Sequence, residues 1–494
     1  MDTIQSVLQG FAVALTIKNL AFAFAGVLLG TLVGVLPGIG PAAGISLLLP
    51  STYRADPIAS MIMLCGLYYG TMYGGSTTSI LVNIPGEAAS IVTCFDGYQM
   101  ARQGRAGPAL GIAAFGSFIA GTVSVVGLMF LAPTLASFAL KFGSPEYFSL
   151  MVMSMTLVTY LSQRSMIKGI MMASLGLILS VVGMDPVTAK LRFTYDILVL
   201  RDGLGIVPVV MGLFGVSEVL LNVGVGIDRE VFKTKIKYLF PNRQDWRDSS
   251  MPIVRGSFMG FILGIIPGIG GIIPTFISYG LEKRLSKHPE QFGTGRIEGV
   301  AGPESCNNAA ATGTFVPMFS LGIPANAITA ILLGALTIYG LQPGPLLVSE
   351  HPDLFWGVIA SMYIGNVMLL VLNLPLIPLW VLILKVPYMI LYPLILLFCL
   401  IGAYTLSNSV GDVIIMCIFG VVGIFMKKFQ FEPAPLVLAL VLGPMMEDNL
   451  RQSLIISGGN FAAFFTRPLS AFFLIVSLVI LLIPIFKLRY SKPR

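Results

Sequence analysis

Charged side chains are scarce in this sequence. Asp, Glu, Lys and Arg make up 11% of its 494 residues, against roughly 25% in ordinary globular domains. Hydrophobic residues make up 56%, and the mean hydropathy is +0.88. A soluble fold of this size could not cover its surface with so few charges. The composition therefore excludes a cytosolic enzyme, a disordered chain and a nucleic-acid-binding protein, and it predicts an all-α polytopic membrane protein.

Residues and motifs for metal or nucleotide chemistry are also rare. The only two histidines, His288 and His351, each precede a proline in a polar stretch, and the five cysteines form no CxxC pair. Walker A, HExxH and GxSxG strings are absent, as are the residue pairs of an intramembrane protease. We therefore expect free thiols, no enzyme activity, no cofactor and no metal beyond a transported Na⁺.

Apolar segments long enough to cross a bilayer fill most of the chain. Several exceed one crossing in length and contain internal Gly and Pro, so we expect about ten to twelve crossings together with broken or re-entrant pieces. Short basic loops are expected on the cytoplasmic side. The predicted units are an N-terminal segment (1–19), a first transmembrane repeat (20–221), a cytoplasmic basic loop (222–255), a second repeat (256–467), and a terminal helix with a cytoplasmic basic tail (468–494).

The segment at 252–281 predicts a re-entrant hairpin. Basic stretches flank it on both sides, and a Pro-Gly pair interrupts its middle. A single crossing would put one of these basic stretches on the wrong side of the membrane. The same rule places Arg102, Arg105, Lys427 and Lys428 in the cytoplasm.

An internal repeat is visible in the glycine pattern. Residues 26–40 read GVLLGTLVGVLPGIG and residues 256–270 read GSFMGFILGIIPGIG, at an offset of 230. A second match, at a slightly different offset, pairs residues 83–86 (NIPG) with residues 322–325 (GIPA). One GxxxG string is a common helix-packing device, but two long strings that are each followed by a second matched interruption indicate duplication. We expect the two repeats to be inverted relative to each other.

The interruptions have a physical meaning. Proline lacks an N–H and glycine relaxes helical geometry, so each break leaves backbone groups that hydrocarbon cannot satisfy. Paired breaks at matching positions of two halves are typical of the substrate site of a secondary transporter. Close packing of kinked helices without any ligand is the alternative interpretation. The break residues assigned to the site are Pro37, Gly38, Gly40, Pro85, Gly86, Pro267, Gly268, Gly270 and Pro324.

Polar side chains gather near these breaks. Carboxylates inside a membrane are costly and usually functional, so Glu87 and Glu304 are candidate cation ligands or proton carriers. The alternatives are an exposed loop position for Glu304 and helix capping for Asn307 and Asn308, and Asp96 is expected in a loop. The polar candidates for the site are Ser76, Thr77, Thr78, Asn83, Glu87, Glu304, Ser305, Asn307, Asn308, Thr312 and Asn326.

Basic residues are scarce in the apolar segments. A bound anion would therefore be held by N–H groups at the N-termini of half-helices, together with Ser, Thr and Asn side chains. Carbonyl oxygens freed at the breaks suit a hard cation such as Na⁺. This chemistry favours a cation-coupled anion transporter. A channel-like or scaffold subunit without its own substrate site is the alternative, although a channel would need polar residues along a continuous pore.

A resemblance to a known family rests on three strings. They are GTLVGVLPGIGPAAGISLLLP at 30–50, YYGTMYGGSTTSILVNIPGEAASIVTCFDGYQMARQG at 68–104, and GPESCNNAAATGTFVPMFSLGIPANAITAILLGAL at 302–336. They resemble the large membrane subunit of the tripartite tricarboxylate transporters, the TctA family. The resemblance covers nearly the whole chain, is specific in 26–105 and 256–340, and weakens beyond 350.

The resemblance implies a multi-pass carrier of the bacterial inner membrane. Its partners would be a small membrane subunit and a periplasmic solute-binding protein that delivers a carboxylate. Uptake would be symport with Na⁺ or H⁺ by an elevator-like movement, and citrate is one of several carboxylates that the family suggests. The motif residues that the resemblance assigns to the site are Pro37, Gly38, Gly40, Asn83, Pro85, Gly86, Glu87, Pro267, Gly268, Gly270, Glu304, Asn307, Asn308 and Pro324.

Overall fold

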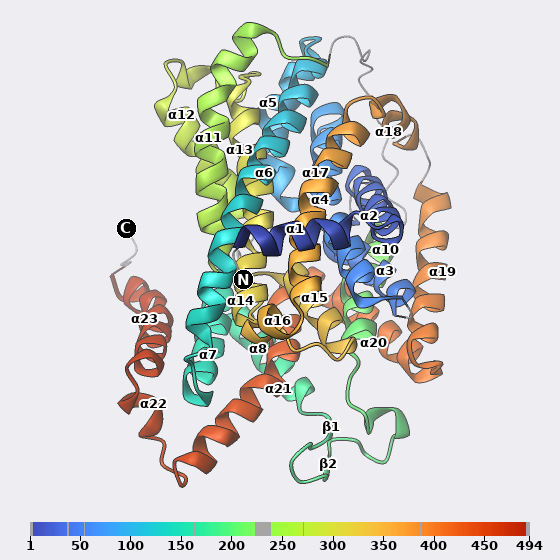
Figure 1. Ribbon diagram of the computed structural model, residues 1–494. Coiled ribbons are helices and arrows are strands. Elements are labelled where there is room, and N and C mark those ends of the chain that lie inside the picture. The colour runs from blue at the N-terminus through green and yellow to red at the C-terminus, as the bar shows by residue number, and fades with distance from the viewer. Residues whose placement is uncertain are drawn as a thin grey trace.

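Helices dominate the computed structural model (Figure 1). Its strands within the described residues, β1 (Gly183–Met184) and β2 (Leu191–Arg192), pair antiparallel in one short hairpin. The prediction of an all-α polytopic membrane protein is therefore confirmed. The structure describes residues 3–36, 39–53, 55–161, 165–222, 239–269, 271–384 and 388–490.

The chain divides into two halves, and each half contains one copy of the internal repeat. The first half contains α1 (Thr3–Ala14), α2 (Ile17–Val35), α3 (Gly40–Thr52), α4 (Pro57–Val82), η1 (Ala88–Ser90), α5 (Ile91–Arg102), α6 (Ala106–Ala139), α7 (Ser144–Tyr160), α8 (Met166–Ser180), η2 (Leu198–Leu200), α9 (Ile206–Val210), the π-helical η3 (Met211–Val216) and α10 (Ser217–Asn222). The second half contains α11 (Arg243–Ile265), α12 (Ile272–Leu285), η5 (Pro289–Gln291), α13 (Glu298–Gly313), α14 (Phe315–Leu321), α15 (Ala327–Ile338), α16 (Pro345–Glu350), α17 (Pro352–Asn373), α18 (Ile377–Ile383), α19 (Tyr388–Ser407), α20 (Val410–Lys428), α21 (Pro433–Ile456), α22 (Ala463–Thr466) and α23 (Pro468–Tyr490).

Four described helices are long and apolar enough to cross a membrane, namely α2, α6, α17 and α20. Several shorter apolar helices accompany them, including α8 and α15. A crossing that is interrupted at a break divides into two shorter helices, so a count of long helices is lower than a count of crossings. The expected ten to twelve crossings stay a prediction.

The glycine pattern packs the same way in both halves. In each half three glycines bring the helix that precedes the first break against the second α-helix after that break. A Cβ added to any of the six would lie 2.2–2.4 Å from a carbonyl oxygen of that helix. The facing residues of the two halves are 239 positions apart, so the packing reproduces the internal repeat. The contacts are Gly26–Met63, Gly30–Leu67 and Gly34–Thr71 between α2 and α4, and Gly256–Gly302, Gly260–Cys306 and Gly264–Ala310 between α11 and α13.

Helices α11 and α12 form the predicted hairpin. Arg255 of α11 donates from Nε to Glu282 Oε1 of α12 at 2.8 Å, so positions well before and well after the break lie side by side. Both helices lie at the same end of the molecule in Figure 1. In the first half, a Cβ added to Gly44 of α3 would lie 2.9 Å from Val33 Cγ1 of α2, which shows that the chain also folds back at the first break.

The polar loop expected at 222–255 is shorter than predicted. Helix α11 begins at Arg243, because Asn242 Oδ1 caps it by accepting hydrogen bonds from the N–H groups of Gln244 and Asp245 at 2.8 and 2.9 Å. Residues 243–255 are therefore helical, and residues 223–238 lie outside the described part of the chain. The charged composition of 243–255 resembles a loop but belongs to a polar helix end.

Three basic stretches meet at one end of the molecule. Arg105 forms an ion pair with Asp245, and Gln103 Nε2 donates to the Thr294 carbonyl at 2.6 Å. Figure 1 places α5, α11 and α12 at this end and the β1–β2 hairpin at the opposite end. These contacts agree with one shared side for the three stretches.

The buried core lies against the residues that line the site. Phe315, Phe319 and Phe355 follow one another with ring centroids 5.7 Å apart, and all three are fully buried. The ring of Tyr68 packs on Phe315 at 5.8 Å. This aromatic cluster holds α4, α14 and α17 together.

Candidate substrate and ion site

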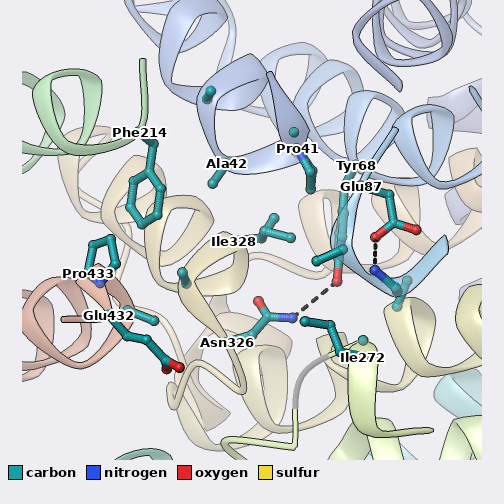
Figure 2. Close-up of a pocket in the computed structure, with 18 of the residues that line it drawn as sticks. Pro41, Ala42, Tyr68, Glu87, Phe214, Ile272, Asn326, Ile328, Glu432 and Pro433 are labelled. Carbon is teal, nitrogen blue, oxygen red and sulfur yellow. Dashed lines mark hydrogen bonds between the residues drawn. The ribbon is translucent and has the colours of Figure 1, made fainter. Parts of the chain in front are cut away.

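The breaks of the two halves meet at one cavity of about 620 Å³. The N-terminal ends of four helices line it, those of α3, η1, α12 and α15. Figure 2 shows Pro41, Glu87, Ile272 and Asn326 around the cavity. Residues of α4 and α13 complete this side. The opposite wall comes from η3, α10 and the turn between α20 and α21.

The second break has the same local structure in both halves. Asn83 ends α4 with φ +59°, and Gly322 ends α14 with φ +70°, so the chain turns through a left-handed residue at matching positions. Glu87 then caps η1, and its carboxylate accepts a hydrogen bond from the Ala89 N–H at 2.5 Å. Asn326, 239 residues after Glu87, caps α15 and accepts from the Thr329 N–H at 2.9 Å. The duplication therefore extends to the helix caps.

The two breaks of each half also touch each other. A Cβ added to Gly86 would lie 2.1 Å from the Gly34 carbonyl oxygen. In the second half the Gly268 N–H donates to the Ala325 carbonyl at 2.8 Å, and Gly268 has a φ of +87°. The residues Pro85, Gly86, Pro267, Gly268 and Pro324 thus shape the breaks without lining the cavity.

Both candidate carboxylates are buried. The exposed fraction is 7% for Glu87 and 1% for Glu304, so the loop interpretation of Glu304 is wrong. Ser76 Oγ donates to Glu304 Oε2 at 2.5 Å, and Thr93 Oγ1 donates to Oε1. Neither carboxylate has an ion-pair partner among the described residues. Glu87 lines the cavity, whereas Glu304 does not.

The two asparagines lie inside α13, so the capping interpretation is wrong for both. Asn307 donates from Nδ2 to Glu87 Oε1 at 3.0 Å and lines the cavity. Its Oδ1 is buried and has no donor among the described residues. Asn308 donates instead to Ser117 Oγ at 2.6 Å, away from the cavity. Asn307 therefore brings an unsatisfied acceptor to the cavity wall beside Glu87.

The hydroxyl candidates support the site without lining it. Thr78 Oγ1 donates to the Val35 carbonyl at 2.9 Å and so satisfies the last turn of α2 before the first break. Thr312 Oγ1 bonds to the Asn308 carbonyl within α13. Ser305 and Thr77 are buried away from the cavity, and Asn83 is exposed.

Some predicted residues lie outside the described part of the chain. They are Pro37, Gly38 and Gly270. Their neighbours Gly40 and Gly271 line the cavity, and Gly40 has a φ of +67°. Of the candidate site residues that are described, the cavity is lined by Gly40, Glu87, Asn307 and Asn326.

The loop assignment of Asp96 is wrong. Asp96 lies within α5 and is fully buried. Its Oδ1 accepts hydrogen bonds from the backbone N–H groups of Gly293, Gly295 and Arg296 at 2.8–2.9 Å, and Oδ2 accepts from Tyr279 at 2.9 Å. Asp96 therefore holds the segment before α13 in place.

The wall formed by η3, α10 and the α20–α21 turn was not predicted from the sequence. It brings Phe214, Glu218, Lys427 and Glu432 to the cavity. Lys427 lies near the end of α20 and forms an ion pair with Glu218, a contact that the sequence did not indicate. On the other side Tyr68 was also missed, and its hydroxyl accepts from Asn326 Nδ2 at 3.1 Å (Figure 2).

Duplicated halves with breaks that converge on one cavity are typical of membrane transporters. The chain belongs to the tripartite tricarboxylate transporter TctA family, whose model matches residues 20–438. This confirms the resemblance seen in the sequence and makes the chain a membrane component of a transporter family.

Two relatives from Agrobacterium vitis are similar to this chain. An uncharacterized 52.8 kDa protein in the TAR-I ttuC' 3' region is 49% identical over 495 residues, which cover 100% of this chain and 99% of the relative. An uncharacterized protein in the TAR-II ttuC' 3' region is 47% identical over 233 residues, which cover 47% of this chain and 96% of the relative. No solved structure gives a significant match.

Proposed function

We propose that this chain is the large permease subunit of a tripartite system that imports a tricarboxylate or a related carboxylate across the bacterial inner membrane. The observation that carries the proposal is the meeting of four helix starts, two from each half, around one cavity. Family membership supports the class of substrate and the tripartite assembly. The partners are then a small membrane subunit and a periplasmic solute-binding protein.

The helix starts supply the chemistry for an anion. The first turn of a helix has N–H groups without intrahelical partners and a partial positive charge, which favours a carboxylate. Small residues such as Gly40, Ala42, Ala88 and Ala327 line the cavity at these starts. Because their side chains are short, a carboxylate can approach the backbone N–H groups closely.

The side chains that line the cavity carry more negative than positive charge, which favours a bound cation. Among the described lining residues Glu87, Glu218 and Glu432 are acidic and Lys427 is basic. An added carboxylate would meet net repulsion, which a co-bound Na⁺ or proton removes. We assign this cation to the carboxylate of Glu87 and the Oδ1 of Asn307, because oxygen ligands suit a hard cation and this acceptor has no other donor. Glu304 is the second candidate, as a proton carrier.

An elevator-like movement is proposed for the transport step. The cavity lies between the broken hairpins on one side and the wall of α10 and the α20–α21 turn on the other. Movement of the hairpins along this wall would carry the substrate across the membrane.

Reconstituted uptake tests the proposal. The chain and its small subunit are placed in proteoliposomes with a candidate solute-binding protein, and uptake of labelled citrate, succinate and malonate is measured under imposed Na⁺ or pH gradients. We expect saturable uptake of at least one carboxylate that collapses when an ionophore removes the gradient. Linear flux that persists without a gradient would favour the channel, and the absence of carboxylate uptake would contradict the proposal.

A further inference from the structure

Lys427 brings one positive charge to a cavity with three acidic lining residues. Its ammonium forms an ion pair with Glu218 of α10, and both side chains line the cavity. Their exposed fractions are 35% for Lys427 and 25% for Glu218. Among the described lining residues no other basic side chain reaches the cavity. The ammonium is therefore open to a solute and is not sealed in the core.

The ion pair lies on the wall that faces the helix starts. Figure 2 shows Phe214, Glu432 and Pro433 on one side of the cavity and Glu87 on the other. Phe214 precedes Glu218 by about one helical turn, and Glu432 lies in the turn between α20 and α21, directly before α21 begins. A ligand that spans the cavity would thus contact N–H groups at one end and the ammonium at the other.

We propose that Lys427 binds a second carboxylate of the substrate, so that the cavity selects di- and tricarboxylates over monocarboxylates. This inference rests on the proposed function, in which the helix starts bind the first carboxylate. The cavity volume of about 620 Å³ is within the range of about 300–1,000 Å³ for small-molecule sites. The unsatisfied Asn307 Oδ1 at the opposite wall, assigned above to the coupling cation, is an independent sign that this cavity binds solutes.

Glu218 is the competitor in this scheme. In the empty cavity its carboxylate neutralises the Lys427 ammonium, and a substrate carboxylate takes its place on binding. The Lys427 ammonium is paired in both states, and the displaced Glu218 carboxylate, whose side chain is 25% exposed, turns to water. A monocarboxylate has no second group to offer and leaves the Lys427–Glu218 pair intact. Lys427 and Glu218 therefore have opposite effects on the binding of polycarboxylates.

Binding measurements on the purified full-length chain test this assignment. The probes are propionate, succinate and citrate, titrated calorimetrically at fixed NaCl and pH. Lys427→Gln should weaken succinate and citrate binding by about 10- to 100-fold, the effect expected when a charged hydrogen-bonding partner is removed, and leave propionate within about twofold of wild type. Glu218→Gln should tighten succinate binding. Lys427→Arg should restore most of the affinity that Lys427→Gln loses, because it keeps the charge.

Lys428 provides the matched control, because it is adjacent, exposed and does not line the cavity. Lys428→Gln should bind all three probes as wild type does. Wild-type succinate affinity in a folded Lys427→Gln protein would overturn the assignment, as would equal losses for propionate and succinate. If the wild-type chain binds none of the probes, the carboxylate site itself is wrong and the role of Lys427 falls with it. Size-exclusion profiles and thermal unfolding establish that each variant is folded.

Discussion

Replacing Glu87 by Asn separates the structural role of this residue from its charge. Glu87 and Asn326 occupy equivalent positions, and each caps a helix start with a hydroxyl residue three positions later. Asn326 shows that a neutral amide can form this cap, and Asn is among the preferred N-cap residues. We therefore expect Glu87→Asn to change the free energy of unfolding by less than about 1 kcal/mol.

The functional effect of Glu87→Asn should be much larger. Asn is one methylene shorter and carries no charge, so it cannot hold a cation together with Asn307. An interaction with a charged group contributes about 1.5–3 kcal/mol, which corresponds to about a 10- to 150-fold weaker apparent affinity for the coupling cation. The structural basis is the 3.0 Å contact between Asn307 Nδ2 and Glu87 Oε1 at the cavity wall.

The assay is carboxylate uptake into proteoliposomes as a function of Na⁺ concentration and pH. Asn326→Ser is the matched control, because it changes the equivalent cap and introduces no change of charge. It should keep the cation dependence of wild type. If Glu87→Asn is folded and shows the wild-type dependence on both Na⁺ and pH, Glu87 does not hold the coupling ion.

Three further predictions concern the framework of the site and are checked by thermal unfolding in detergent. Gly260→Ala should lower the free energy of unfolding by about 1–3 kcal/mol, because the added Cβ would lie 2.3 Å from the Cys306 carbonyl oxygen. Gly280→Ala is the control, because a Cβ there would have no atom within 4 Å. Equal effects of the two substitutions would contradict the packing of α11 on α13. Asn83 has a φ of +59°, so Asn83→Gly should leave the free energy of unfolding nearly unchanged and Asn83→Val should lower it by about 1–2 kcal/mol. A larger loss for Asn83→Gly than for Asn83→Val would exclude a left-handed residue at this position. Arg255→Ala should cost about 3 kcal/mol, because it leaves Glu282, which is 2% exposed, without its ion pair. Adding Glu282→Gln should recover part of this loss, and a neutral effect of Arg255→Ala would argue against the hairpin.

The repeat and its breaks were predictable because their signals are local. A glycine at every fourth position needs only helical periodicity to form a stripe that another helix can approach, and a Pro-Gly pair interrupts a helix wherever it occurs. The contacts of Gly30 with Leu67 and of Gly260 with Cys306 follow from such a stripe. The hairpin at 252–281 was predictable for a similar reason, since basic residues on both sides imply that both ends share one side.

The wall formed by η3, α10 and the α20–α21 turn could not be predicted from these signals. Lys427 follows an apolar run in the sequence and is followed by another lysine, a pattern that is typical of the cytoplasmic end of a membrane segment. Only the packing of α20 against η3 and α10 brings Lys427 to Glu218 and to the cavity. Phe214 and Glu218 carry no motif, so the sequence offers no signal for their position.

Burial of the polar residues also depended on distant partners. Asp96 lies close to Arg102 in the sequence, which suggested a loop, and an exposed loop position near Arg296 was the alternative interpretation for Glu304. In the fold Asp96 accepts three backbone N–H groups from residues 293–296, and Glu304 accepts the hydroxyls of Ser76 and Thr93. Each partner is more than 190 residues away along the chain, so local pattern could not reveal these contacts.

The most direct test of the account is a cryo-EM map of the full-length chain in lipid nanodiscs, recorded with a carboxylate that the uptake assay has identified and with its coupling cation. The account predicts ligand density between the starts of α3, η1, α12 and α15, in contact with the wall that carries Lys427. Density for the carboxylate at another place in the protein, with this cavity empty while uptake activity is retained, would contradict it.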